Sequence, residues 1–167
     1  MEMKQLHAEP LTRAAFAPFG DVIEFSGSAE KFDINYGFAS RFHDLAKVDV
    51  AESGGRPLIS LVHSRHVECP FDIEELERHP LSSQAFIPLG DHPFLVIVAP
   101  AGPFDPARIK AFLAAPGQGI NYARGTWHHY LLPLGADSSF IIVDRGGEEK
   151  NCDIERIEDG NRYQVLR

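Results

Sequence analysis

Short apolar runs separated by turn-forming residues limit most strongly what this chain can fold into. Four such runs, rich in Val, Ile, Leu and Phe, are bounded by Pro, Gly, Asp or Ser. They lie at residues 58–62, 86–89, 94–98 and 140–143. Runs of this length and composition are typical of strands packed inside a sandwich or barrel. The sequence therefore predicts a mainly β protein.

Two segments favour helix instead. Residues 12–19 begin with a threonine suited to capping, contain three alanines and are followed by Gly20, which can close a helix. Residues 106–115 follow Asp105, a good N-cap, and start with a proline at the first turn. Two helices are too few for repeated β–α–β units, so we expect an all-β barrel or jelly roll with peripheral helices.

Length, charge and cysteine content narrow the class of protein. The 167 residues fit a single domain over residues 1–167. A net charge of -8, without a cluster of basic residues, predicts no nucleic-acid partner. The start of the chain lacks the apolar core of a signal peptide, and the longest apolar run, 94–99, is too short to cross a bilayer. Cys69 and Cys152 have no metal-ligand spacing, so free thiols and a cytoplasmic location without a membrane partner are expected.

Polar side chains stand beside strand-forming residues in three segments, which we take as candidate site segments. The first, residues 75–90, carries Glu77, His79 and Gln84 just before a predicted strand. Alternate residues of an extended segment share a face, so Glu77 and His79 can point the same way. A turn with solvated charges is the alternative interpretation.

The second segment, residues 117–135, contains the adjacent histidines His128 and His129. Neighbouring residues of a strand point to opposite faces, so only one of the two is expected to enter the site. The further polar or aromatic members are Asn121, Tyr122 and Trp127. A buried Trp127 beside a histidine would exclude water and tune the basicity of the imidazole. An ordinary aromatic core strand with one satisfied histidine is the alternative.

The third segment, residues 140–153, runs from an apolar strand directly into Asp144, Arg145 and two glycines. An arginine at the mouth of a barrel can hold a carboxylate with two parallel hydrogen bonds. A surface turn with an Asp–Arg pair is equally compatible with these residues. The three segments together predict a small β-barrel enzyme with a His/Arg/Asn site for a carboxylate-bearing substrate, and their spacing does not name that substrate.

Over nearly its whole length, the chain resembles the ureidoglycolate lyase family. The resemblance is carried, in the family's order, by FDINYGFASRFHDL, ELERHPLSSQAFIP, GQGINYARGTWHHYL and FIIVDRGGEEKNCD. It implies a cupin-like double-stranded β-helix (jelly-roll) barrel that forms a homodimer. It also implies cleavage of (S)-ureidoglycolate to glyoxylate and urea in allantoin and purine nitrogen breakdown.

The similarity of this family to cupins also implies a position for a metal ion. The first cupin motif falls on Glu77, His79 and Gln84, and the second on Gly125 and His128. Two imidazoles, a carboxylate and an amide can hold a divalent ion, but less firmly than three histidines. Loosely held Ni, Mn or Zn and metal-free chemistry both stay open. No organic cofactor is expected, because no glycine-rich nucleotide-binding motif is present.

Residue roles follow from the resemblance as hypotheses. His128 or His79 is the expected base, and Glu77 is the second acid or base. Arg145 or Arg41 is expected to hold the substrate carboxylate. The remaining predicted substrate-binding residues are Asn35, Gln84, Asn121, Tyr122 and Trp127.

Other functions on the same scaffold remain as alternatives. The first is another cupin enzyme, an isomerase or a metal-dependent dioxygenase that uses Glu77, His79 and His128. The second is a non-catalytic cupin that binds a small acid, because a fold alone does not decide function. An amidohydrolase that releases ammonia from ureidoglycolate would need a firmer metal site than these ligands offer.

Overall fold

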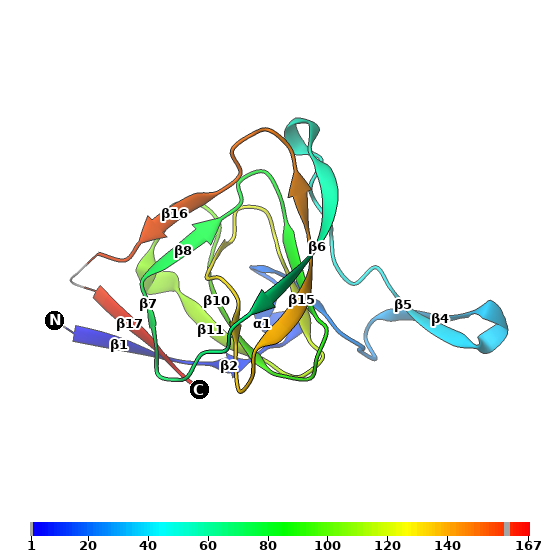
Figure 1. The fold of residues 1–167 in the computed structure, drawn as a ribbon, viewed down its shortest axis with the longest axis horizontal. Coiled ribbons are helices and arrows are strands. Elements are labelled where there is room, and N and C mark those ends of the chain that lie inside the picture. The colour runs from blue at the N-terminus through cyan, green and yellow to red at the C-terminus, as the bar shows by residue number, and fades with distance from the viewer. Residues whose placement is uncertain (1, 159–160) are drawn as a thin grey trace.

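Two large β-sheets face each other across the core of the protein (Figure 1). The computed structural model describes residues 2–158 and 161–167. The first sheet is antiparallel and has the strand order β3 (Gly20–Ile23), β12 (Gly119–Tyr122), β9 (Gln84–Pro88), β15 (Ser138–Gly146) and β6 (Arg56–Ser64). We call it the front sheet.

The second large sheet, which we call the back sheet, carries the opposite wall of the core. Its strand order is β16 (Asp153–Arg156), β8 (Glu75–Arg78), β13 (Trp127–His128), β10 (Phe94–Ala99), β11 (Lys110–Ala114) and β2 (Glu9–Pro10), with β14 (Leu132–Pro133) also paired to β10. Its pairs are antiparallel except for β11 and β2.

Smaller elements complete the fold. A three-stranded sheet has the order β1 (Glu2–His7), β17 (Asn161–Leu166) and β7 (Phe71–Ile73). The helical elements are α1 (Arg13–Phe16) and the short 3-10 turns η1 (Asn35–Gly37), η2 (Glu52–Gly54) and η3 (Pro106–Arg108). Strands β4 (Glu30–Ile34) and β5 (Ala39–His43) form a hairpin over residues 30–43 that projects from the sandwich at the right of Figure 1, and we call it the arm. No helix in the described part of the chain is long and apolar enough to span a membrane.

Strand β10 lies between two apolar cores, which explains why its sequence is a continuous apolar run. Phe94, Val96 and Val98 belong to the core between the two large sheets. Leu95 and Ile97 point the other way, into a second core that is shared with residues of the three-stranded sheet. A strand buried on both faces gains apolar contacts at every position, so no polar alternation appears in its sequence.

The mainly β, cupin-like fold is confirmed, with one qualification. The two large sheets form a sandwich, and no ladder between the described strands closes them into a continuous barrel. The first predicted helix is confirmed in a shorter form, as α1, where Thr12 Oγ1 accepts a hydrogen bond of 3.2 Å from the backbone N–H of Ala15.

The second predicted helix, over residues 106–115, is wrong. Asp105 does cap a turn, since its carboxylate accepts from the backbone N–H of Ala107 at 2.9 Å, but that turn ends at Arg108. Strand β11 follows and pairs with β10. Its residues alternate between the two cores, with Phe112 in one and Ala111 in the other. An apolar run buried on both faces cannot be told from a helix by its periodicity.

The predicted strand at 58–62 exists within β6, but only one of its faces packs toward the core, through Val62. Ile59 is 80% exposed and Leu61 is 74% exposed. Both point to the outside of the front sheet, where the register places them beside Val143 and Ile141 of β15. With Ile87 of β9 these residues form an apolar surface across three strands, which we call the outer face.

Candidate active site

Three side chains predicted to form a site do converge at one point of the sandwich. Glu77, His79 and His128 each offer one ligand atom, and these atoms lie within 4.8 Å of one another. Glu77 Oε1 is 3.4 Å from His128 Nε2 and 3.9 Å from His79 Nε2. We call this group the cluster.

Strand pairing brings the cluster together. Glu77 on β8 lies directly opposite His128 on β13 in an antiparallel ladder, so their side chains project from the same face of the back sheet. His79 follows Glu77 by two residues and keeps the same direction. His128 is far from Glu77 and His79 in the sequence, and the pairing of β8 with β13 explains its proximity to them.

His128 is held in one protonation state by its surroundings. It is 1% exposed, and its ring stacks on Tyr122 with centroids 4.1 Å apart and planes 12° apart. Burial lowers the pKa of the His128 imidazole, so the ring is neutral at pH 7. Its Nδ1 lies 3.0 Å from the carbonyl oxygen of Thr126, which can only accept, so the proton sits on Nδ1.

The lone pair of His128 Nε2 therefore faces the Glu77 carboxylate. A contact with His128 is the main cause that keeps the pKa of Glu77 below its usual range, against the opposing effect of burial, and this contact requires a proton between the two groups. The 3.4 Å between His128 Nε2 and Glu77 Oε1 is within ion-pair distance. Nε2 is nevertheless buried without a hydrogen-bond partner among the described residues. Two acceptors aimed at one point need a shared proton or a cation between them.

His79 is fixed by two acceptors. Its Nδ1 lies 2.7 Å from the carbonyl oxygen of Asn151, and its Nε2 lies 3.1 Å from Gln84 Oε1. The amide nitrogen of Gln84 donates in turn to Asp144 Oδ2 at 3.3 Å. A hydrogen-bonded chain of side chains thus runs from β15 through β9 to the cluster, and it sets the direction of the Gln84 amide.

Two members of this environment were not singled out by the sequence analysis. Asn151 supplies the carbonyl that orients His79, and its own side chain binds Ser82 and the backbone of Leu81. Asp144 orients Gln84. Both lie in the DRGGEEKNCD block, which was the only available signal. Cys152, from the same block, approaches Glu77 Oε2 at 3.7 Å, and burial raises the pKa of its thiol, so the S–H proton stays on sulfur.

Arg145 lies away from the cluster. It points to the opposite face of β15 from Asp144, because neighbouring residues of a strand alternate. Its guanidinium is buried and donates to the backbone carbonyl of Glu52 at 2.9 Å through Nη2. Side chains at Gly55 or Gly147 would clash with this guanidinium. The glycines therefore allow a close approach of the backbone to Arg145.

Trp127 and Asn121 also lie elsewhere. Trp127 belongs to the second core, where its Nε1 donates to the carbonyl of Gly102 at 2.9 Å. The expectation that Trp127 packs beside the catalytic histidine is corrected, because Tyr122 stacks on His128 instead. The Asn121 side chain points away from the core and donates to the Asp21 carboxylate at 3.0 Å.

Asn35 and Arg41, the remaining predicted residues, lie on the arm. Asn35 is at its tip, in the turn η1. Arg41 is on β5, with its guanidinium 5.9 Å from the centre of the Phe32 ring. Because the arm projects away from the sandwich, the fold does not bring them to the cluster of their own chain (Figure 1).

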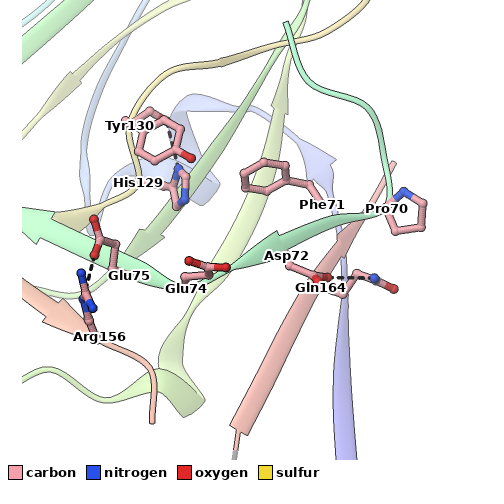
Figure 2. Close-up of a pocket in the computed structure, with 9 residues that line it drawn as sticks. All are labelled: Pro70, Phe71, Asp72, Glu74, Glu75, His129, Tyr130, Arg156 and Gln164. Carbon is pink, nitrogen blue, oxygen red and sulfur yellow. Dashed lines mark hydrogen bonds and ion pairs between the residues drawn. The ribbon is translucent and has the colours of Figure 1, made fainter. Parts of the chain in front are cut away.

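His129 faces a different cavity from His128. A pocket of about 530 Å³ lies beside His129. Figure 2 shows its lining, which is Pro70, Phe71, Asp72, Glu74, Glu75, His129, Tyr130, Arg156 and Gln164. We call it the outer pocket. Burial lowers the pKa of His129 to about 4, so this ring is neutral as well.

Comparisons with known proteins agree with the resemblance of the sequence blocks. A family model described as ureidoglycolate lyase matches residues 3–164. A ureidoglycolate lyase of Burkholderia mallei is 56% identical over 93% of this chain and 91% of the relative. Ureidoglycolate lyases of Chelativorans sp. (50% identical, 90% of this chain, 91% of the relative) and Mesorhizobium japonicum (47% identical, 98% of each chain) are similar over the same span.

Proposed function

Because this chain belongs to the ureidoglycolate lyase family, we propose that its cluster of Glu77, His79 and His128 cleaves ureidoglycolate to glyoxylate and urea. The convergence of these three side chains, two of them with lone pairs aimed at one point, carries the proposal. It offers groups that can accept and supply protons within reach of one carbon atom.

The reaction needs two proton movements and no water. In ureidoglycolate one carbon carries a hydroxyl, a carboxylate and a ureido nitrogen. Removal of the hydroxyl proton lets that oxygen become the carbonyl of glyoxylate, while the carbon–nitrogen bond breaks. The departing nitrogen takes up a proton, and urea leaves. A base and an acid on two sides of the carbon are therefore sufficient.

His128 fits the base. Its ring is neutral, its Nδ1 proton is held by the Thr126 carbonyl, and its Nε2 lone pair is directed into the cluster. When Nε2 takes the hydroxyl proton, the Glu77 carboxylate at 3.4 Å stabilises the imidazolium that forms. The buried ring cannot reorient without losing the stack on Tyr122.

His79 fits the acid. Both of its ring nitrogens face acceptors, the Asn151 carbonyl and Gln84 Oε1, so the doubly protonated ring satisfies both contacts. The bond from Gln84 to Asp144 keeps the amide oxygen, rather than the amide nitrogen, turned toward His79. His79 can then supply a proton to the leaving nitrogen, and the amide of Gln84 can recognise the ureido group.

A divalent ion fits the same residues. As an alternative to these acid–base roles, Glu77, His79 and His128 would hold it, with Gln84 Oε1 beside them, and the unpartnered Nε2 of His128 would then be a ligand atom. Two imidazoles and a carboxylate suit Ni, Mn or Zn. Such an ion would supply Lewis acidity to the substrate hydroxyl.

The carboxylate of the substrate needs a cation, and we assign Arg41 to it rather than Arg145. Arg145 already donates to the carbonyls of Glu52 and Ser53. We further propose that the protein acts as a homodimer, supported by the exposed outer face. Cys69 and Cys152, which form no disulfide within the described residues, support a cytoplasmic location.

The test is a product assay on purified protein with racemic ureidoglycolate. Glyoxylate, urea and ammonia are followed separately, with and without a chelator. We expect glyoxylate and urea in equal amounts without ammonia. Release of ammonia would identify an amidohydrolase, and tight binding of glyoxylate without turnover would identify a small-acid-binding cupin.

The chelator arm tests the metal proposal separately. Loss of activity that returns with Ni, Mn or Zn would assign a working ion to the cluster. Activity unchanged by the chelator would leave His128 and His79 as the only acid–base groups required. Iron-dependent uptake of oxygen, by contrast, would point to a dioxygenase.

A further inference from the structure

We propose that the active site is completed by the arm of a second copy of the chain, which places its Arg41 against the substrate carboxylate. This inference rests on the proposed function, because it identifies the source of the cation that cleavage requires. It goes further by assigning the site to two subunits.

The arginines nearest the cluster along the chain are already engaged. Arg78 on β8 pairs with Asp153 at 3.0 Å and lies over the ring of Trp127, on the far side of the back sheet. Arg124, before β13, donates to the carboxylates of Asp49 and Glu52 at 2.7 and 3.1 Å. Arg145 is bound to the carbonyl oxygens of residues 52 and 53. None of these three is available for a substrate carboxylate without breaking an existing contact.

Arg41 differs from these arginines because no carboxylate of the described residues holds it in an ion pair. Its contact is with the face of Phe32 on the neighbouring strand, 5.9 Å from the ring centre. A planar guanidinium can bind a carboxylate with two parallel hydrogen bonds while it stays stacked on an aromatic ring. Arg41 therefore has the right chemistry but lies on an arm that projects away from its own sandwich (Figure 1).

The arm has the surface of a segment that is covered by another molecule. A two-stranded hairpin alone is only marginally stable in water. Nevertheless Tyr36 and Phe38 at its tip are 104% and 93% exposed. Asn35 and Tyr36 both have positive φ angles, 53° and 59°, a conformation that side chains other than glycine seldom adopt. Contacts with a partner would stabilise both the apolar side chains and the strained turn.

A second copy fits as that partner. The same chain carries a flat apolar surface, the outer face, on which Ile59 and Leu61 are largely exposed. A two-fold axis would lay each arm across the outer face of the other subunit, so both surfaces would be buried twice. One large aromatic side chain buries about 150–250 Å² of surface. Two of them together with the outer face approach the roughly 800 Å² that each partner buries in a stable interface.

The outer face and the cluster lie on opposite sides of the front sheet, near the same end of it. Ile141 and Val143 point outward on β15, whereas the next residue, Asp144, points inward and is linked through Gln84 to His79. Strands β4 and β5 have five residues each, so the arm is about 17 Å long. An arm laid along the outer face would have to pass over the end of the sandwich, where Gln84 begins β9, to bring Arg41 and Asn35 to the cluster.

Mixed dimers, which combine two subunits that carry different substitutions, test the inference. Two differently tagged chains are co-expressed, and the mixed dimer is isolated by both tags. In the first mixed dimer, one chain carries Arg41→Ala and the other carries His128→Ala. One site then combines an intact cluster with an intact arm from the other chain, so we expect about half of the wild-type activity.

The reciprocal dimer is the matched control. One chain carries both substitutions and the other is wild type, so neither site has an intact cluster and an intact partner arm. With both mixed dimers assayed at a substrate concentration well below KM, where loss of Arg41 lowers the rate, we expect almost no activity from it. If each site were built from one chain, the results would reverse, with half activity in this dimer and almost none in the first. That reversal, or a monomeric protein with full activity, would overturn the inference.

Homodimers of arm variants separate binding from folding. Arg41→Ala should raise KM more than tenfold with a smaller change in kcat, and Arg41→Lys should recover only part of the loss. Lys31→Ala removes another arm cation, which lies over the ring of Phe42, and should leave KM unchanged. An unchanged KM in Arg41→Ala would also refute the assignment. A wild-type protein that forms no glyoxylate would instead refute the proposed function itself.

Discussion

The adjacent histidines His128 and His129 lie in unlike settings. His128 looks into the sandwich and His129 into the outer pocket, and both rings are buried and neutral. Both have carboxylates nearby, and the outer pocket is a well-formed cavity of about 530 Å³ (Figure 2). Within residues 2–158 and 161–167, only the cluster around His128 brings three ligand atoms within 4.8 Å of one another.

From this difference we infer that convergence of polar atoms, more than the size of a cavity, marks the active site proposed above. In the outer pocket Glu75 pairs with Arg156 at 3.3 Å and Asp72 accepts from Gln164 at 2.9 Å, so these carboxylates already have partners. In the cluster, by contrast, the lone pair of His128 Nε2 is buried without a partner among the described residues. A buried polar atom without a partner is costly to keep, and a functional site is one reason to keep it.

The strongest test of this comparison is to replace each of the two histidines in turn. His128→Ala should lower kcat/KM by about 10²–10⁴, the usual contribution of a general base. His129→Ala should change it by less than about threefold, since a residue outside the site makes no contact in the transition state. Steady-state kinetics of glyoxylate release measures both. Equal losses of kcat/KM in the two variants would show that the cluster and the outer pocket do not differ in the way proposed.

The second test compares one carboxylate of the cluster with one of the outer pocket. Glu77→Gln should lower kcat by roughly 10²-fold, because the imidazolium formed on His128 would lose its neighbouring charge. Glu75→Gln removes an exposed pairing with Arg156, so kcat should be unaltered. The same assay applies, with circular dichroism as the check on folding. A fully active Glu77→Gln variant would contradict the proposed role of the carboxylate.

The outer histidine should instead affect stability against acid. His129 has a pKa of about 4 in the folded protein, against an ordinary value of 6.5, because it is buried. Between these values the unfolded chain binds the extra proton and the folded chain does not, so stability falls as pH decreases. Lowering the pH from about 7 to 5 should cost about 2 kcal/mol through this group.

Urea unfolding at the two pH values measures that loss. His129→Gln should show a loss smaller by about 2 kcal/mol than the wild type, since glutamine does not titrate. Stability that depends on pH equally in both proteins would show that His129 is not buried as described. The variant should keep its activity, because His129 lies in the outer pocket and not in the cluster.

The smallest expected effect concerns two aspartates that each accept a hydrogen bond from a glutamine. Asp144 orients Gln84 beside the cluster, and Asp72 accepts from Gln164 in the outer pocket. Asp144→Asn should reduce kcat by roughly tenfold, as expected when a residue that orients a site residue is changed. Asp72→Asn should have no effect on kcat. Equal kinetics in both variants would leave Asp144 without a positioning role.

Much of the fold could be predicted from the sequence because short apolar runs between turn residues describe strands directly. The predicted strand at 94–98 is nearly the whole of β10. The failure at 106–115 has a physical cause, since β11 is buried between two cores and its apolar residues show no strand alternation. Likewise, Ile59 and Leu61 were expected inside, because an apolar pattern does not tell a core from an uncovered outer face.

The candidate site could be predicted only in part. Glu77 and His79 share a face by alternation, and only one of the two adjacent histidines could join them. That rule does not say which one, and the answer depends on the pairing of β8 with β13. Arg145 and Trp127 were assigned from their chemistry and from their place in motif blocks, but their side chains point away from the cluster. Long-range pairing decides such directions, and a single sequence does not encode it locally.

The central claim is that ligand binds at the cluster, next to His128, and not in the outer pocket, and the histidine ring nitrogens report on it directly. Histidine labelled with a nitrogen isotope can be followed by NMR during a titration with glyoxylate, and His128→Ala and His129→Ala assign the two signals. We predict that the free protein shows His128 as a neutral ring with its proton on Nδ1, and that glyoxylate shifts its Nε2 signal while that of His129 stays fixed. A shift confined to His129, with His128 unmoved, would place the ligand in the outer pocket and contradict the account.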